Sequence, residues 1–128
     1  MEITVNNANL AYEKAQLLAS VSITSSSSGI IEESLSQNIS SGDNIVLVFE
    51  GLNVSDFTTG SNDLVQVIVR ETNGSPTNQD TFQLYRTDDV NRKEHTMAGT
   101  GITYTSFGVY IPSPKYQGEG YTIKAYLV

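Results

Sequence analysis

The stretch ITYTSFGVYI at residues 102–111 decides the fold class of this chain. Its side chains alternate between two faces, with Thr103, Thr105, Phe107, Val109 and Ile111 on one and Tyr104, Ser106, Gly108 and Tyr110 on the other. This period of two predicts a β-strand, because successive side chains of a strand point to opposite faces. A Pro-Ser-Pro break at 112–114 and a Gly-Glu-Gly turn at 118–120 lead into a second alternating run, YTIKAYLV at 121–128, which we expect to pair with the first.

Three further runs carry the same period. From Gly42 onward, Ile45, Leu47 and Phe49 alternate with Val46, Val48 and Glu50, and both faces are largely apolar as far as Glu50, which predicts a central, covered strand. Residues 64–71, LVQVIVRE, place valines on one face and Gln66, Ile68 and Arg70 on the other, the pattern of a half-buried antiparallel strand. Asn73-Gly74 and Pro76 then predict the loop of a hairpin that returns through residues 81–87. The polar stretch 88–94 interrupts the pattern, and a short strand at 95–98 is a weaker prediction.

The N-terminal region supports two interpretations. Residues 7–19 have apolar side chains near helical spacing, with Asn7 or Asn9 as an N-cap, and predict a short helix. A loose arm that ends in a strand from Ala19 to Thr24 is the alternative, because Val21 and Ile23 alternate. The serine run 25–28 is the best linker candidate, so we divide the chain into an arm or first strand at 1–24, which is no independent domain, and a body at 29–128.

Seven or eight short strands with turn signals between them predict an all-β fold, a single antiparallel β-sandwich of immunoglobulin-like or jelly-roll kind. The Cys, Trp and Cys signature of antibody domains is absent, since the chain contains neither residue type. The topology therefore stays open between the two kinds.

Composition narrows the function classes. The chain has 128 residues, no cysteine, a formal net charge of -7 and a pI near 4.4. An acidic surface repels phosphate backbones and anionic head groups, so we expect neither nucleic acid nor membrane as a partner. Glu2 stands where a signal peptide would carry positive charge, and no apolar run follows it, so we expect no signal peptide. Localisation stays unknown, with a virion as one candidate.

Few residues suggest catalysis. His95 is the sole histidine, and together with a serine it would be needed for a nucleophilic mechanism. It sits in the polar stretch Arg92-Lys93-Glu94-His95-Thr96, and the chain has no Gly-x-Ser-x-Gly elbow. We therefore expect a non-enzymatic protein without catalytic residues.

The sequence offers two kinds of candidate ligand site, one for calcium and one for a sugar. Acidic residues gather near predicted turns, namely Asp43, Asp56, Asp63, Asp80, Asp88 and Asp89. Calcium takes roughly six to eight oxygen ligands, but Asp in turns is explained by local hydrogen bonds, so we expect no metal and no cofactor. Tyr104 and Tyr110 share a predicted strand face with Ser106 and Gly108 between them, and they are the candidate residues for stacking a sugar ring.

These features favour a binding or structural role over catalysis. The first hypothesis is an accessory component of a larger assembly, such as a phage or other virion decoration, head-fibre or tail protein, attached to a protein partner through segment 1–24 or through loops. The alternative is a secreted or surface adhesion or carbohydrate-binding module that recognises its ligand through loops 51–63, 73–80 and 88–100. Edge strands make a homo-oligomer chemically accessible.

Overall fold

The computed structural model describes residues 16–24, 29–57, 63–72, 78–85, 91–111, 118 and 120–128. These residues form eight strands and one 3₁₀-helix and contain no α-helix. The strands are β1 (Gln16–Ile23), β2 (Gly29–Ser40), β3 (Asn44–Glu50), β4 (Asp63–Arg70), β5 (Gln79–Tyr85), β6 (Arg92–Thr96), β7 (Thr103–Ile111) and β8 (Tyr121–Leu127), and the 3₁₀-helix is η1 (Val54–Asp56). The predicted all-β class is confirmed.

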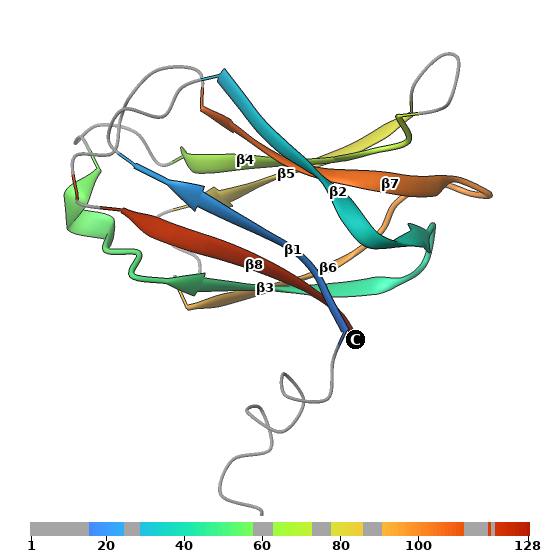
Figure 1. The fold of residues 1–128 in the computed structure, drawn as a ribbon, viewed down its shortest axis with the longest axis horizontal. Coiled ribbons are helices and arrows are strands. Elements are labelled where there is room, and N and C mark those ends of the chain that lie inside the picture. The colour runs from blue at the N-terminus through green and yellow to red at the C-terminus, as the bar shows by residue number, and fades with distance from the viewer. Residues whose placement is uncertain are drawn as a thin grey trace, which may run out of the picture.

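The strands form two four-stranded antiparallel sheets that pack face to face (Figure 1). Sheet A has the order β1-β8-β3-β6, and sheet B has the order β2-β7-β4-β5. The pairings are nested, since β4 pairs with β5, β3 with β6, β2 with β7 and β1 with β8. One long antiparallel ribbon, rolled up so that β3 meets β8 and β4 meets β7, gives this arrangement. It is the jelly-roll topology, so the jelly roll is the one of the two predicted sandwiches that is observed.

This topology decides two predicted pairings. The hairpin of residues 64–71 and 81–87 is confirmed, because β4 and β5 are antiparallel neighbours with Val67 opposite Phe82. The pairing of 102–111 with 121–128 is wrong, because β7 lies in sheet B and β8 in sheet A. In a rolled ribbon the seventh and eighth strands fall in opposite sheets, and the connection 112–120 passes between them. The prediction of a central strand through Ile45 to Glu50 is confirmed, because β3 lies between β8 and β6.

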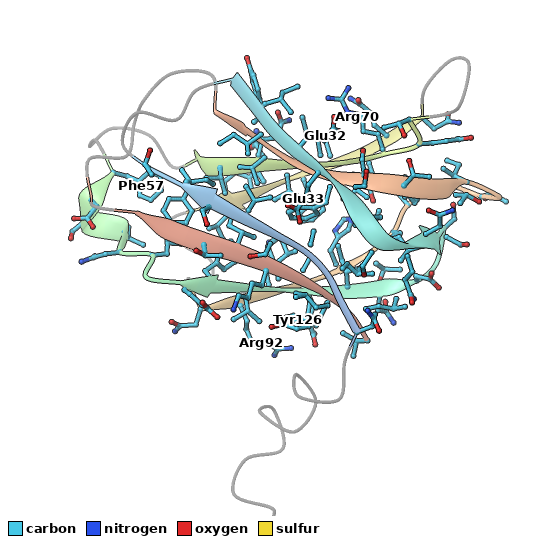
Figure 2. The ribbon with its side chains drawn as sticks, in the orientation of Figure 1. Glu32, Glu33, Phe57, Arg70, Arg92 and Tyr126 are labelled. Atoms are coloured by element: carbon cyan, nitrogen blue, oxygen red, sulfur yellow. The ribbon has the colours of Figure 1, made fainter. Side chains whose placement is uncertain are left out.

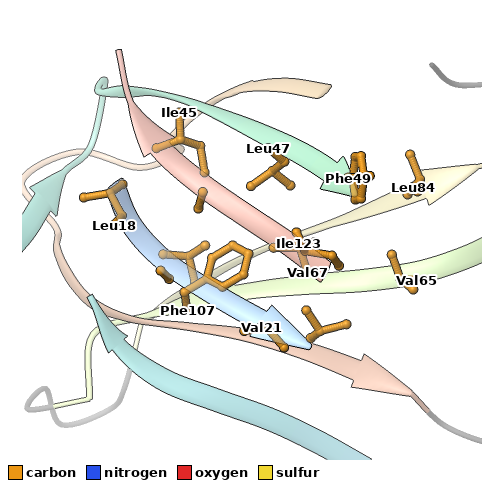
Figure 3. Close-up of a cluster of buried hydrophobic side chains, with 14 of the residues drawn as sticks. Leu18, Val21, Ile45, Leu47, Phe49, Val65, Val67, Leu84, Phe107 and Ile123 are labelled. Carbon is orange, nitrogen blue, oxygen red and sulfur yellow. The ribbon is translucent and has the colours of Figure 1, made fainter. Parts of the chain in front are cut away.

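The core fills the space between the two sheets (Figure 3). Both sheets contribute side chains that are at most 1% exposed, including Leu47 and Ile123 from sheet A and Val67, Leu84 and Phe107 from sheet B. Their strands supply alternate residues to this space, as the period of two requires. Burial of these aliphatic and aromatic side chains is the main favourable term that holds the sheets together.

The N-terminal helix prediction is wrong where it can be examined. Residues 16–19 belong to β1, which pairs along its length with β8, and residues 7–15 lie outside the described residues. Leu18 and Ala19 are both buried because the register with β8 shifts between Leu17 and Ala19, so a local bulge brings two consecutive side chains into the core. The alternative of a first strand is correct, and this strand starts three residues before Ala19.

Strand β6 occupies part of the stretch expected to be irregular. It covers Arg92–Thr96, whereas the weak strand prediction began at His95. Residues 92–94 carry no alternating apolar pattern, because β6 is an edge strand whose side chains are all exposed or half-buried. The sequence therefore did not predict this part of the strand.

The two ends of the sandwich differ. At the terminal end, β1 begins beside the end of β8, with Gln16 opposite Leu127 (Figure 1). The turns 41–43 and 97–102 are joined there, since Gly42 N donates to Met97 O (2.8 Å) and Met97 N donates to Asp43 O (2.8 Å). At the opposite, distal end lie the strand ends that border four connections, 24–28, 51–62, 86–91 and 112–120.

Candidate functional site

The single histidine lies at the open edge of the sandwich. His95 is on β6, the edge strand of sheet A, and Asp80 is on β5, the edge strand of sheet B. Both face inward, because His95 lies opposite the buried Ile45 and Asp80 lies opposite the buried Val69. His95 Nε2 is 2.7 Å from Asp80 Oδ2, so one polar contact joins the two sheets.

Two further contacts hold this pair in place. The same carboxylate oxygen accepts a hydrogen bond from Ala98 N at 2.9 Å. The imidazole ring stacks on Phe82, with 3.8 Å between ring centroids and 14° between ring planes. Asp80 is 8% exposed, and a buried carboxylate needs such donors. We call His95, Asp80, Phe82 and Ala98 the edge cluster.

Tyr104 lies next to this cluster and not on the surface. It is 1% exposed, and its hydroxyl donates to Ala98 O. Burial raises the pKa of the Tyr104 phenol above its ordinary value, and the negative charge of Asp80 adds to the shift. The side chain therefore stays a neutral hydrogen-bond donor.

The edge cluster contains the histidine and the carboxylate of a catalytic triad, but it lacks the third member. Among the described residues, no hydroxyl group makes a hydrogen bond to His95. The base and its orienting acid would need a nucleophile on the second ring nitrogen. In this geometry the pair joins β5 to β6 and satisfies the N–H of Ala98.

The structure separates the two candidate tyrosines. Alternation places Tyr104 and Tyr110 on one face, but Tyr104 is in the core and Tyr110 is half-buried on the outer face of sheet B. The departure from alternation lies beside a register shift, where Ser34 to Ile39 of β2 lie opposite only Ser106 to Tyr104 of β7. The predicted pair is therefore wrong as a shared stacking surface, and only Tyr110 faces outward.

Tyr110 belongs to a row that crosses all four strands of sheet B. It lies opposite Ile30 of β2 on one side and Gln66 of β4 on the other, and Gln66 lies opposite Gln83 of β5. Alternation along each strand separates Gln66 and Gln83 from the buried valines and leucine beside them. Only the register shows that they continue one row with Tyr110.

A charged pair lies beside this row (Figure 2). Glu32 Oε2 accepts from Arg70 Nε at 2.7 Å and from Ser106 Oγ at 2.9 Å. Glu32 reaches across β7 because Gly108 lies beneath it, where an added Cβ would stand 3.4 Å from Glu32 Cβ. The glycine therefore leaves room for the carboxylate to meet its two donors.

The acidic residues do not gather at one end. Asp43 lies at the terminal end, where its carboxylate accepts from Ser40 N, and Asp56 is in η1 near the distal end. Asp80 contacts His95, while Asp88, Asp89 and the side chain of Asp63 lie outside the described part. No three His, Asp or Glu side chains of the described residues form a group that could hold a metal ion.

The three predicted recognition loops lie partly outside the described ranges, since residues 58–62, 73–77 and 88–90 are not described, and their flanking strand ends lie at different ends of the sandwich. Connection 51–62 is at the distal end, and the β4–β5 loop 71–78 is at the terminal end. Most of the predicted loop 88–100 is strand β6 and the tight turn that follows it. A shallow pocket at the terminal end lies between Asn44, Glu94, Thr96 and Val128, beside His95.

No helix within the described ranges is long and apolar enough to cross a membrane. Comparison of the chain with protein-family models, with curated proteins and with solved structures finds no match.

Proposed function

We propose that this chain is a non-enzymatic accessory or structural component of a larger assembly, such as a virion decoration, head-fibre or tail protein. The supporting observation is that the two ends of the sandwich differ. Segment 1–15 joins the fold at the terminal end, and the four connections of the distal end lie on the opposite side. A domain attached through segment 1–15 therefore presents its distal connections away from the attachment point.

Two further observations support the proposal, one from the terminal end and one from the fold. Its turns 41–43 and 97–102 are bonded to each other, and Val128 N donates to Asn44 O, so the base of the sandwich is firmly closed. By analogy at the level of the fold, jelly rolls also recur in viral capsid and lectin domains.

The lysine positions allow a direct test. Lys14 lies in segment 1–15, and Lys115 lies in connection 112–120 of the distal end. Amine-reactive cross-linking in the cell that produces the protein, followed by mass spectrometry, should join Lys14 to a second protein and leave Lys115 without such links. Intermolecular links concentrated at Lys115 would contradict the proposed orientation.

A matched pair of variants tests the attachment itself. Ile3→Asp with Val5→Asp adds two negative charges at apolar positions of the segment, and Asn6→Asp with Asn7→Asp adds the same charge at polar positions. We expect the first variant alone to lose the Lys14 cross-links, with an unchanged circular dichroism spectrum. Equal loss in both variants would point to charge repulsion, and no loss in either would refute attachment through the segment.

A further inference from the structure

We propose that the outer face of sheet B binds a neutral polysaccharide along the row Ile30, Tyr110, Gln66 and Gln83. This inference goes beyond the proposed function and does not depend on segment 1–15, because the row lies on strands β2, β7, β4 and β5. We call it the glutamine–tyrosine row. Neighbouring strands are about 4.8 Å apart, so the row forms a straight strip across the whole sheet.

The outward direction of the row follows from its neighbours. Val109, Val67 and Leu84 adjoin Tyr110, Gln66 and Gln83 in sequence, and each is 0% exposed in the core. Alternation therefore directs the row away from sheet A. Ile30 is 46% exposed, while the other three side chains are half-buried.

The polar atoms of the row are available to a ligand. Neither amide nor the Tyr110 hydroxyl makes a hydrogen bond to another residue within the described ranges. Each amide offers one acceptor oxygen and two donor hydrogens, and the phenol can donate and accept. Vicinal hydroxyl groups of a sugar also donate and accept, so amides are suitable partners for them. The Tyr110 ring adds an apolar surface for the C–H face of a sugar ring.

The charge of this face favours a neutral ligand. Glu32 and Arg70 are the charged groups among its described side chains, and they neutralise each other across 2.7 Å. The chain as a whole carries -7, which would repel an anionic polymer over the range of the Debye length. An uncharged strip on an acidic protein is therefore suited to a neutral chain.

A neutral, extended polymer also fits the shape of the row better than a small ligand. The row lies on an open sheet, and pockets that enclose small molecules are concave. Beside it, Gly108 contributes no side chain, and the Glu32 side chain lies over that position on its way to Arg70. Tyr85, 38% exposed, adds a second exposed aromatic side chain on β5.

Affinity electrophoresis of the full chain tests the proposal. The probes are hydroxyethylcellulose, a mixed-linkage β-glucan and a galactomannan as neutral polymers, and polygalacturonate as the anionic one. We expect retardation by at least one neutral polymer and none by polygalacturonate. Tyr110→Ala should weaken this binding about tenfold, and Gln66→Ala and Gln83→Ala about fivefold each.

Tyr126→Ala is the matched control, because Tyr126 is a half-buried tyrosine of β8 on the outer face of sheet A (Figure 2). Its binding should stay within about twofold of the wild type. Gln83→Ala keeps the test decisive if Tyr110→Ala fails to fold.

The proposal is overturned by the absence of retardation in all three neutral gels, by retardation in polygalacturonate alone, or by equal loss in Tyr126→Ala. It is equally overturned if light scattering shows a dimer that Tyr110→Ala dissociates, since a second copy would then cover the row. None of these outcomes alters the Lys14 cross-linking result, so the two proposals fail separately.

Discussion

At the scale of single residues, the edge cluster is the most consequential polar feature. Asp80 accepts from His95 and from Ala98 N while it is largely buried, so it links the edge strands of sheets A and B. A charge-assisted hydrogen bond in such a place contributes about 1.5–3 kcal/mol, and an orphaned buried carboxylate costs at least as much.

A double-mutant cycle should measure this contribution. His95→Phe keeps a ring against Phe82 but removes the nitrogen that contacts Asp80, and Asp80→Ala removes the carboxylate. We expect each single variant to lose about 2 kcal/mol in the free energy of unfolding, with a coupling of about 1–2 kcal/mol. Urea denaturation provides the measurement. Glu94→Ala on the same strand removes an exposed ion pair with Arg92 and should cost under about 1 kcal/mol. Additive losses would show that the pair does not join the sheets.

The buried phenol of Tyr104 makes the stability of the protein depend on pH. Its phenol pKa is raised in the folded state, so the unfolded chain releases this proton first as the pH increases. The corresponding stability is fully present below the unfolded tyrosine pKa of about 10 and is lost as the pH rises through the folded value. Urea unfolding between pH 8 and about 11.5 should therefore show a steeper alkaline loss for the wild type than for Tyr104→Phe. Parallel pH profiles would contradict the buried, neutral phenol.

At the scale of elements, β1 is part of the core and not a detachable arm. Leu18, Val21 and Ile23 are each at most 3% exposed, and removal of one such side chain costs about 2–5 kcal/mol. Removal of all three would cost about as much as the usual stability of about 5–15 kcal/mol for a whole domain. A chain that starts at Gln16 should unfold cooperatively in urea, and one that starts at Gly29 should not. Cooperative unfolding of the shorter chain would show that sheet A tolerates the loss of its edge.

The same elements show which parts of the fold the sequence could predict. Strands β3, β4, β5, β7 and β8 follow a period of two, and that pattern is local. Strand β1 was ambiguous because Leu17 and Leu18 also suit a helix, and only the pairing with β8 decides between them. Tyr104 lies in the core although alternation along β7 predicts the outer face, and a register shift between β2 and β7 adjoins it. The edge cluster and the glutamine–tyrosine row were not predictable, since both join residues through registers that tertiary packing sets.

At the scale of the whole molecule, nested pairing implies an order of folding. The hairpin β4–β5 joins residues close in sequence, and β1–β8 joins the two ends of the described chain. Loop closure costs more for distant segments, so the inner hairpin should form before the outer pair.

Stopped-flow kinetics of the variants Val67→Ala and Val21→Ala test this order, because both valines are buried. Val67→Ala should mainly slow folding and Val21→Ala should mainly accelerate unfolding, each at about 2 kcal/mol of lost stability. The opposite pattern would place the nucleus at the outer pair.

The same antiparallel β1–β8 pair determines how the molecule responds to mechanical force. Gln16 lies opposite Leu127, so tension between the two chain ends would pull these neighbours apart at their shared end, one ladder step at a time. Tension between segment 1–15 and the distal connections would instead run along the strands. Ladder hydrogen bonds lie perpendicular to the strands, so several would bear that load together in shear. The domain should therefore be weak when pulled by its own termini and strong along the axis that joins its attachment end to its exposed end.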